Sequence, residues 1–165
     1  MGASTVTAGM GLRRATLFVR DLDRMRAFYE GVFGLTLYRE LEVDLSRVKA
    51  LPIGAANPES GSARFIILRG ADPLVGMVGL MQVTAPALPE ANHDVRRLGY
   101  GSVALVMAVK DADQAAADAA RLGGEVIQPV TTARNIGDVA GEFVPVKMFM
   151  AYDPEGHFLE VFAPL

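Results

Sequence analysis

The sequence contains no cysteine and no tryptophan, and it has only two histidines, His93 and His157. Without cysteine, disulfide bonds, thiolate metal sites and cysteine nucleophiles are all excluded. A metal site built from three imidazole groups is excluded by the histidine count. Basic residues are not in excess either, because 16 Lys and Arg stand against 19 Asp and Glu, which gives a net charge of −3. We therefore expect no nucleic-acid partner.

Long apolar runs and targeting signals are also missing. The longest stretch without a charged residue, 73–89, has 17 residues and contains three prolines, so it is unsuited to crossing a bilayer. Residues 1–11 are small and polar, and we expect a flexible leader rather than a secretory signal. Apolar residues nevertheless make up 51% of the chain, which predicts a folded, cytoplasmic protein with no membrane partner.

One order of elements occurs twice along the chain. In the first half the pattern predicts a strand, a helix and three strands at 13–20, 21–34, 35–42, 64–69 and 75–83. In the second half it predicts the same order at 102–109, 111–124, 125–130, 143–152 and 157–162. A shift of 90 positions aligns Val19 with Val109, Asp21 with Asp111, and Gly34 with Gly124. We expect modules at 12–83 and 99–165, joined by a linker at 84–98.

Composition predicts two longer loops, at 52–63 and 131–141, and Arg134 and Asn135 in the second loop are candidates for ligand contact. His93 falls in the linker, and His157 is expected at the surface, where the last strand begins. Each module reads as βαβββ, which predicts an α+β fold. Because a single helix covers only one face of each sheet, two such sheets can enclose a cavity between them.

Two motifs give the chain a resemblance to the vicinal oxygen chelate superfamily, which includes glyoxalase I, bleomycin-resistance proteins and extradiol dioxygenases. They are FVRDLDRMRAFYEGVFGLTL at 18–37 and DPEGHFLEVF at 153–162, one in each half of the repeat. The resemblance covers residues 12–164. It implies two βαβββ modules whose curved mixed sheets form a cup around a cavity, often within a homodimer.

In that family a divalent ion such as Zn, Ni, Fe or Mn is held by a histidine on the first strand of each module and by Glu or Gln on the last. The matching positions here are Arg14, Ala104, Gly79 and Glu160. Only Glu160 can bind a metal, since a guanidinium has no lone pair to donate. The resemblance therefore implies that no cofactor is held. The alternative is a divalent ion held by Glu160 and non-standard ligands.

The residues that share a strand side with Arg14 and Glu160 are predicted to line the cavity, and most are apolar. They are Thr16, Phe18, Met77, Gly79, Met81, Ala104, Val106, Phe158 and Phe162. Arg14 and Glu160 are expected to face one another across it. Two interpretations stay open: the pair binds an anionic or polar substrate group, with Glu160 accepting a proton, or it is a buried ion pair that replaces the metal.

Three functions follow from this sequence. The first is a metal-independent protein that binds a small apolar molecule carrying an anionic or polar group. The second is a glyoxalase-type lyase or isomerase, or an extradiol-type dioxygenase, with an altered metal site. The third is a structural or regulatory partner whose own side chains fill the cavity.

Overall fold

The structure is a computed structural model, and it describes residues 12–47, 61–71, 76–90, 94–136 and 142–165. The first module consists of β1 (Arg14–Phe18), α1 (Leu22–Phe33), β2 (Thr36–Asp44), the 3-10 turn η1 (Leu45–Arg47), β3 (Ser62–Arg69) and β4 (Met77–Ala85). The second consists of β5 (Ala104–Ala108), α2 (Ala112–Arg121), β6 (Glu125–Ile136), β7 (Phe143–Tyr152) and β8 (Phe158–Pro164). The predicted α+β fold with two βαβββ modules is confirmed.

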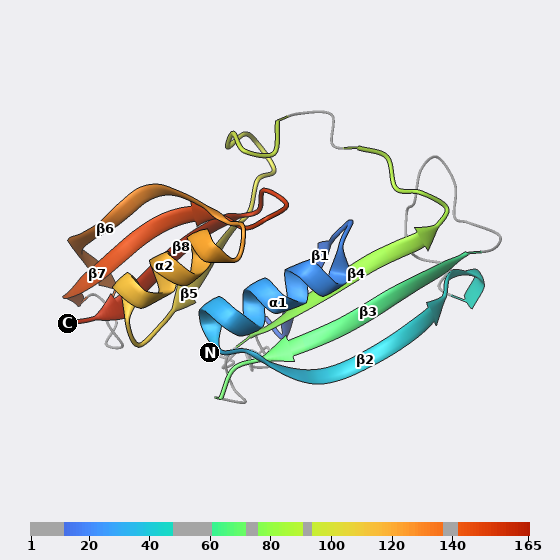
Figure 1. The fold of residues 1–165 in the computed structure, drawn as a ribbon, viewed down its shortest axis with the longest axis horizontal. Helices are drawn as coiled ribbons and strands as arrows, with labels where there is room; N and C mark the ends of the chain where they lie inside the picture. Colours follow the sequence, from blue (N-terminus) through green and yellow to red (C-terminus); the bar gives the residue numbers. More distant parts are fainter. Residues whose placement is uncertain (1–11, 48–60, 72–75, 91–93, 137–141) are drawn as a thin grey trace, which may run out of the picture.

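Each module forms its own mixed sheet of four strands, with the order β1-β4-β3-β2 in the first sheet and β5-β8-β7-β6 in the second. The first strand of each module pairs in parallel with the last, and the remaining pairs are antiparallel. Figure 1 shows α1 and α2 next to each other in the middle of the molecule, each lying against its own sheet.

The inner face of each sheet, which is the face covered by its helix, contributes to one shared apolar core. Leu80 of β4 and Leu159 of β8 both have no exposed surface and belong to the same buried cluster as Phe28 of α1 and Ala119 of α2. The opposite face of each sheet, here called its outer face, therefore points away from the shared core. The alternation of side chains in β-strands puts the predicted cavity residues on these outer faces.

The two helices begin alike and end differently. Asp21 and Asp111 accept hydrogen bonds from backbone N–H groups three residues later, each at 3.0 Å, so both act as N-caps. Gly34 ends α1 with φ +63°, whereas Gly123 has φ +87° after α2. In the second module the positive φ therefore falls one residue before Gly124, the glycine that a shift of 90 positions aligns with Gly34.

Glycines also let the two modules fit closely together. A Cβ atom on Gly31 of α1 would lie 2.5 Å from Leu122 Cδ1, and one on Gly124 would lie 2.8 Å from Phe28 Cε2. Each module thus places a large side chain against a glycine of the other. Within the described residues, neither helix has the length or apolar character needed to cross a membrane.

One loop prediction is corrected by the structure. Residues 131–136 belong to β6, which pairs with β7 as far as Ile136 opposite Phe143. Their polar composition resembles a loop because this edge strand has few apolar contacts to reveal it. The predicted leader 1–11, most of the loop 52–63, the remainder of the loop 131–141, and His93 lie outside the described residues.

Candidate functional site

Arg14 lies on the outer face of the first sheet and is held by two neighbours. Its Nε donates a hydrogen bond to Thr16 Oγ1 at 3.0 Å, and its guanidinium carbon lies 4.9 Å from the centre of the Phe65 ring. A Cβ atom on Gly79 would lie 2.9 Å from Arg14, Thr16 and Phe65 alike. Because Gly79 carries no side chain, the arginine can lie flat across the sheet.

Glu160 lies on the outer face of the second sheet, opposite Val106 of β5 and Met150 of β7. Its Oε1 accepts a hydrogen bond from Asn135 Nδ2 at 3.3 Å. Asn135 was noted in the sequence as a candidate for ligand contact, and the structure places it beside this carboxylate. The acid is partly buried in a mostly apolar setting, where a hydrogen-bond donor stabilises its charge.

The register shows that the two modules correspond. Thr16 pairs with Gly79 in the first sheet and Val106 pairs with Glu160 in the second, and Thr16 and Val106 are 90 positions apart. Gly79 therefore occupies the place in the first module that Glu160 occupies in the second. Gln82 lies three residues after Gly79 in β4, so its side chain is on the other face of the sheet. Its Nε2 donates a hydrogen bond to the backbone oxygen of Arg20 at 2.6 Å.

The other predicted cavity residues differ widely in exposure. Val106 is 56% exposed and Phe18 is 44% exposed, whereas Met81 is only 9% exposed. Met81 packs in a second apolar cluster with Phe65 and Ile67 on the outer face of the first sheet. Strand pairing places four more of these residues on the outer faces: Met77, Ala104, Phe158 and Phe162. Arg14 and Glu160 each have a partner in their own sheet, and the described residues show no contact between the two.

These positions do not fit a divalent cation. Arg14 presents only donors and a positive charge, Ala104 has no ligating atom, and Gly79 has no side chain. Glu160 alone could ligate, and its carboxylate accepts a hydrogen bond from Asn135. Across the described residues, no three His, Asp or Glu side chains gather in a way that could hold a metal ion.

A second polar cluster lies where the modules meet, and its centre is Asp153, whose side chain has no exposed surface. Asp153 Oδ2 accepts hydrogen bonds from Tyr29 Oη at 3.0 Å and from His157 Nδ1 at 2.8 Å. Its Oδ1 accepts from the backbone N–H groups of Glu155 and His157, at 3.0 Å and 2.9 Å. Asp153 therefore shapes its own turn and also ties it to α1.

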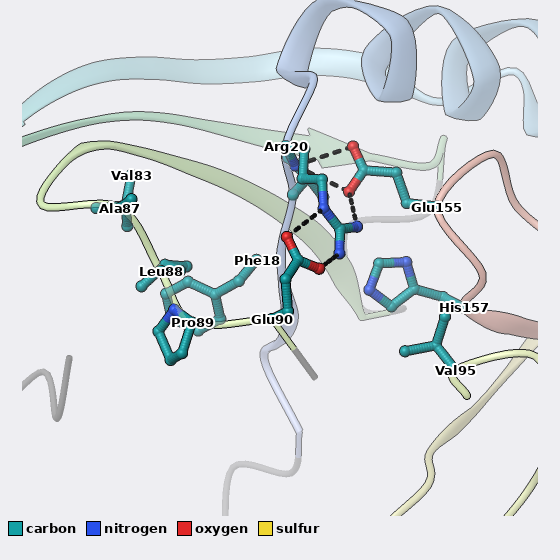
Figure 2. A pocket seen from close by; sticks show the side chains of 11 residues that line it. Phe18, Arg20, Val83, Ala87, Leu88, Pro89, Glu90, Val95, Glu155 and His157 are labelled. Atoms are coloured by element: carbon teal, nitrogen blue, oxygen red, sulfur yellow. Dashed lines mark hydrogen bonds and ion pairs between the residues drawn. The ribbon is translucent and has the colours of Figure 1, made fainter. Parts of the chain in front are cut away.

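Glu155, from the same turn, binds the chain just before α1. Its carboxylate accepts hydrogen bonds from the backbone N–H groups of Arg20 and Asp21 at 2.8–2.9 Å, and its side chain is only 8% exposed. Figure 2 shows the Arg20 guanidinium between Glu155 and Glu90, with His157 beside it. These residues border a cavity of about 510 Å³, here called the junction cavity.

Sequence reasoning did not find the junction cavity. Of the predicted cavity residues, only Phe18 lines it. Its other walls come from the residues that follow β1, from the end of β4 and the segment after it, and from the turn at 153–157, and these meet only through tertiary packing. The turn Asp-Pro-Glu-Gly-His at 153–157 was visible in the sequence. Its two acidic residues beside a histidine were the only sequence feature that could have pointed to a polar site here.

Burial raises the pKa of Tyr29 well above 10.0, and the neighbouring Asp153 carboxylate adds to that shift. In the unfolded chain this phenol ionises near pH 10. Below that pH the folded state keeps the full stability that the buried neutral phenol provides, and above it ionisation in the unfolded chain reduces that stability. We expect the free energy of unfolding to fall above pH 10 by up to about 1.4 kcal/mol per pH unit from this group. Urea unfolding at pH 8–11 measures it, and Tyr29→Phe should flatten the slope. Equal slopes in the two proteins would contradict the assignment.

Comparison with solved structures confirms the fold. A glyoxalase family protein from Bacillus cereus superposes with a TM-score of 0.70 at 18% identity, covering 99% of each chain. A glyoxalase I mutant from Zea mays gives a TM-score of 0.60 at 18% identity over 92% of this chain. This chain spans about half of the maize protein, covering 46% of its length. Glyoxalase I from Leishmania major gives 0.54 at 19% identity, covering 92% of this chain and 85% of that one.

A comparison of the sequence with curated proteins found no match. The family model described as Glyoxalase/Bleomycin resistance protein/Dioxygenase superfamily matches residues 11–161. That range contains the whole of the first motif and all but the last residue of the second, and it covers both modules up to the middle of β8. The chain therefore belongs to the glyoxalase/bleomycin resistance protein/dioxygenase superfamily.

Proposed function

We propose that this chain is a metal-independent binding protein for a small apolar molecule with an anionic group. The observation that carries the proposal is Arg14. It stands at a position where the family places a metal ligand, and contacts with Thr16 and Phe65 fix it in place. Among the described residues it has no carboxylate partner, so its terminal N–H groups are available to bind an anion.

The surroundings of Arg14 suit such a ligand. Phe18 exposes 44% of its surface on the same strand, and Met77 is partly buried opposite Arg14. Aromatic and thioether side chains offer dispersion contacts to an apolar ligand, and the guanidinium fixes its orientation. On the second sheet, Glu160 and Asn135 offer an acceptor and an amide for a polar substituent.

We further propose that the protein is a cytoplasmic homodimer in which the outer faces of two copies meet. The two outer faces of one chain point away from the shared core, so they do not close a site by themselves. Val106 on the second sheet and Phe18 on the first leave about half of their surfaces exposed, and a second copy on the outer faces would cover both. Sedimentation at increasing concentration tests the pairing, and a monomer at every concentration contradicts it.

Replacing Arg14 by glutamine is expected to weaken binding of an anionic apolar probe by about ten- to a hundredfold, because a charge-assisted hydrogen bond is lost. The probe is anilinonaphthalene sulfonate, followed by its fluorescence. Its uncharged relative N-phenylnaphthylamine should bind both proteins equally, since it lacks the sulfonate.

The matched control for that experiment is Arg13→Gln, which removes the same charge from the adjacent exposed residue just outside β1. It should bind both probes like the unchanged protein. Equal loss of both probes in Arg14→Gln would mean that the arginine supports the fold rather than the anion.

The metal-dependent alternative makes a different forecast. If Glu160 holds a divalent ion with non-standard ligands, purified protein will carry Zn, Ni, Fe or Mn in a fixed ratio, and Glu160→Gln will lose it. Metal analysis by mass spectrometry separates the two. Stoichiometric metal that disappears in Glu160→Gln would sink the metal-independent proposal.

A further inference from the structure

The junction cavity has the size and composition of a small-molecule site. Its volume of about 510 Å³ is within the usual range of ligand pockets. Apolar side chains line it on two sides, with Phe18 and Leu88 on one and Val95 beside His157 on the other (Figure 2). Arg20, Glu90, Glu155 and His157 contribute the polar groups (Figure 2).

Arg20 is the best-positioned cation of this cavity. Its backbone N–H donates to the Glu155 carboxylate at 2.8–2.9 Å, and its backbone oxygen accepts from Gln82 Nε2 at 2.6 Å. Hydrogen bonds therefore hold both the backbone N–H and the backbone carbonyl of Arg20 in place. The guanidinium itself remains 60% exposed and reaches into the cavity. A fixed backbone with an accessible fork of N–H donors is the arrangement that recognises carboxylates.

The guanidinium already binds a carboxylate from its own chain. Both terminal oxygens of Glu90 bond to Arg20, through Nε at 3.3 Å and through Nη2. This pairing raises the pKa of Arg20 and lowers that of Glu90. Glu90 is 75% exposed, however, and such exposed pairs contribute little because water and salt compete with them. A ligand that adds apolar contacts to the same two hydrogen bonds can displace it.

The remaining groups restrict the charge of such a ligand. Glu155 is nearly buried and keeps a negative charge near the site, with an oxygen 3.7 Å from Arg20 Nη1, so a second anionic group is disfavoured. His157 Nδ1 lies 2.8 Å from Asp153 Oδ2, so the ring is held against the buried acid at the edge of the cavity. The cavity therefore favours one carboxylate on an apolar body.

We propose that the junction cavity binds a small apolar monocarboxylic acid, whose carboxylate replaces that of Glu90 on Arg20. The apolar body of the acid lies against Phe18, Leu88 and Val95. Glu90 then acts as an internal competitor that sets the affinity of the site. This site shares Phe18 with the one proposed at Arg14 but uses a different cation, Arg20, so the two proposals are tested by different variants.

The test is a titration of the full chain with phenylacetate, followed through the assigned backbone amide signals of Arg20 and Asp21. Glu90→Gln should tighten binding by about two- to fivefold, because the competing carboxylate is gone. Arg20→Gln should weaken it by at least about tenfold. Phenylacetamide, which lacks the charge, should be insensitive to Glu90→Gln. Unchanged or weaker binding in Glu90→Gln overturns the proposal, even if Arg20→Gln were to fold poorly.

Two further variants control the experiment. Arg121→Gln removes a similarly exposed arginine, paired with Asp118 on α2, and should leave the titration unchanged. Arg14→Gln should also leave the signals at Arg20 and Asp21 unchanged, whatever it does to the anionic probe on the outer face. If phenylacetate shifts only signals around Arg14, the junction proposal fails and the outer-face proposal stands.

Discussion

Asp153→Ala is expected to lower the free energy of unfolding by about 3–5 kcal/mol, because it breaks a buried charged network rather than a single contact. The carboxylate accepts four hydrogen bonds, from Tyr29, His157 Nδ1 and two backbone N–H groups of its own turn. Removing it leaves the Tyr29 hydroxyl buried without its acceptor, which is itself costly. Urea denaturation followed by circular dichroism measures the loss.

A suitable control is Asp94→Ala. Asp94 also accepts a backbone hydrogen bond within a turn, from Arg96 at 3.0 Å, but its side chain is 58% exposed. Water can replace the lost acceptor there, so we expect a change below about 1 kcal/mol. If Asp153→Ala stayed within 1 kcal/mol of the unchanged protein, the turn would not be the anchor between the modules that the hydrogen bonds indicate.

Phe28→Ala is expected to cost about 3–5 kcal/mol, because a fully buried aromatic ring is replaced by a cavity that the surroundings cannot fill. Phe28 has no exposed surface, and its ring packs edge to face against Tyr29 at a centroid distance of 5.5 Å. It also lies against Gly124 of the other module. The loss should therefore reduce the stability of both modules together, in a single unfolding transition.

Phe33→Ala is the comparison for this prediction. Phe33 lies on the same helix and contacts Phe28 at a centroid distance of 6.1 Å, but it is only partly buried. Because less apolar surface returns to water, the expected cost is smaller, about 1–2 kcal/mol. Equal losses for the two substitutions, or two separate transitions in Phe28→Ala, would contradict a core shared by both modules.

The order of elements and the faces of the strands were predictable because they depend on local periodicity. Thr16 and Phe18 alternate with Leu17 and Val19, so the two pairs face opposite sides of the sheet, and the resemblance assigned the first pair to the cavity side together with Arg14. Val19 is indeed 4% exposed and lies in the shared core. Asp21, the first residue of the helix predicted at 21–34, is the N-cap of α1 in the structure.

The relation between the modules was not predictable, because it depends on contacts between residues far apart. Gly34 and Gly124 look equivalent in sequence, yet Gly34 serves a left-handed turn and has open space beside it, whereas Gly124 is packed against Phe28 and the backbone of Tyr152. The burial of Asp153 follows from the same packing. Arg14 and Glu160 were expected to face one another, and only tertiary structure could show that each has a hydrogen-bond partner within its own sheet.

The turn at 153–157 has a consequence for how the protein is made. Glu155 bonds to backbone groups 134 and 135 positions earlier, and Asp153 bonds to a hydroxyl group 124 positions earlier. Synthesis proceeds from the N-terminus, so the start of α1 leaves the ribosome long before these partners exist. Until residues 153–157 emerge, the Tyr29 hydroxyl and the N–H groups of Arg20 and Asp21 lack these acceptors. The first module therefore depends on the second for its buried hydrogen bonds, and the two should fold together rather than one after the other.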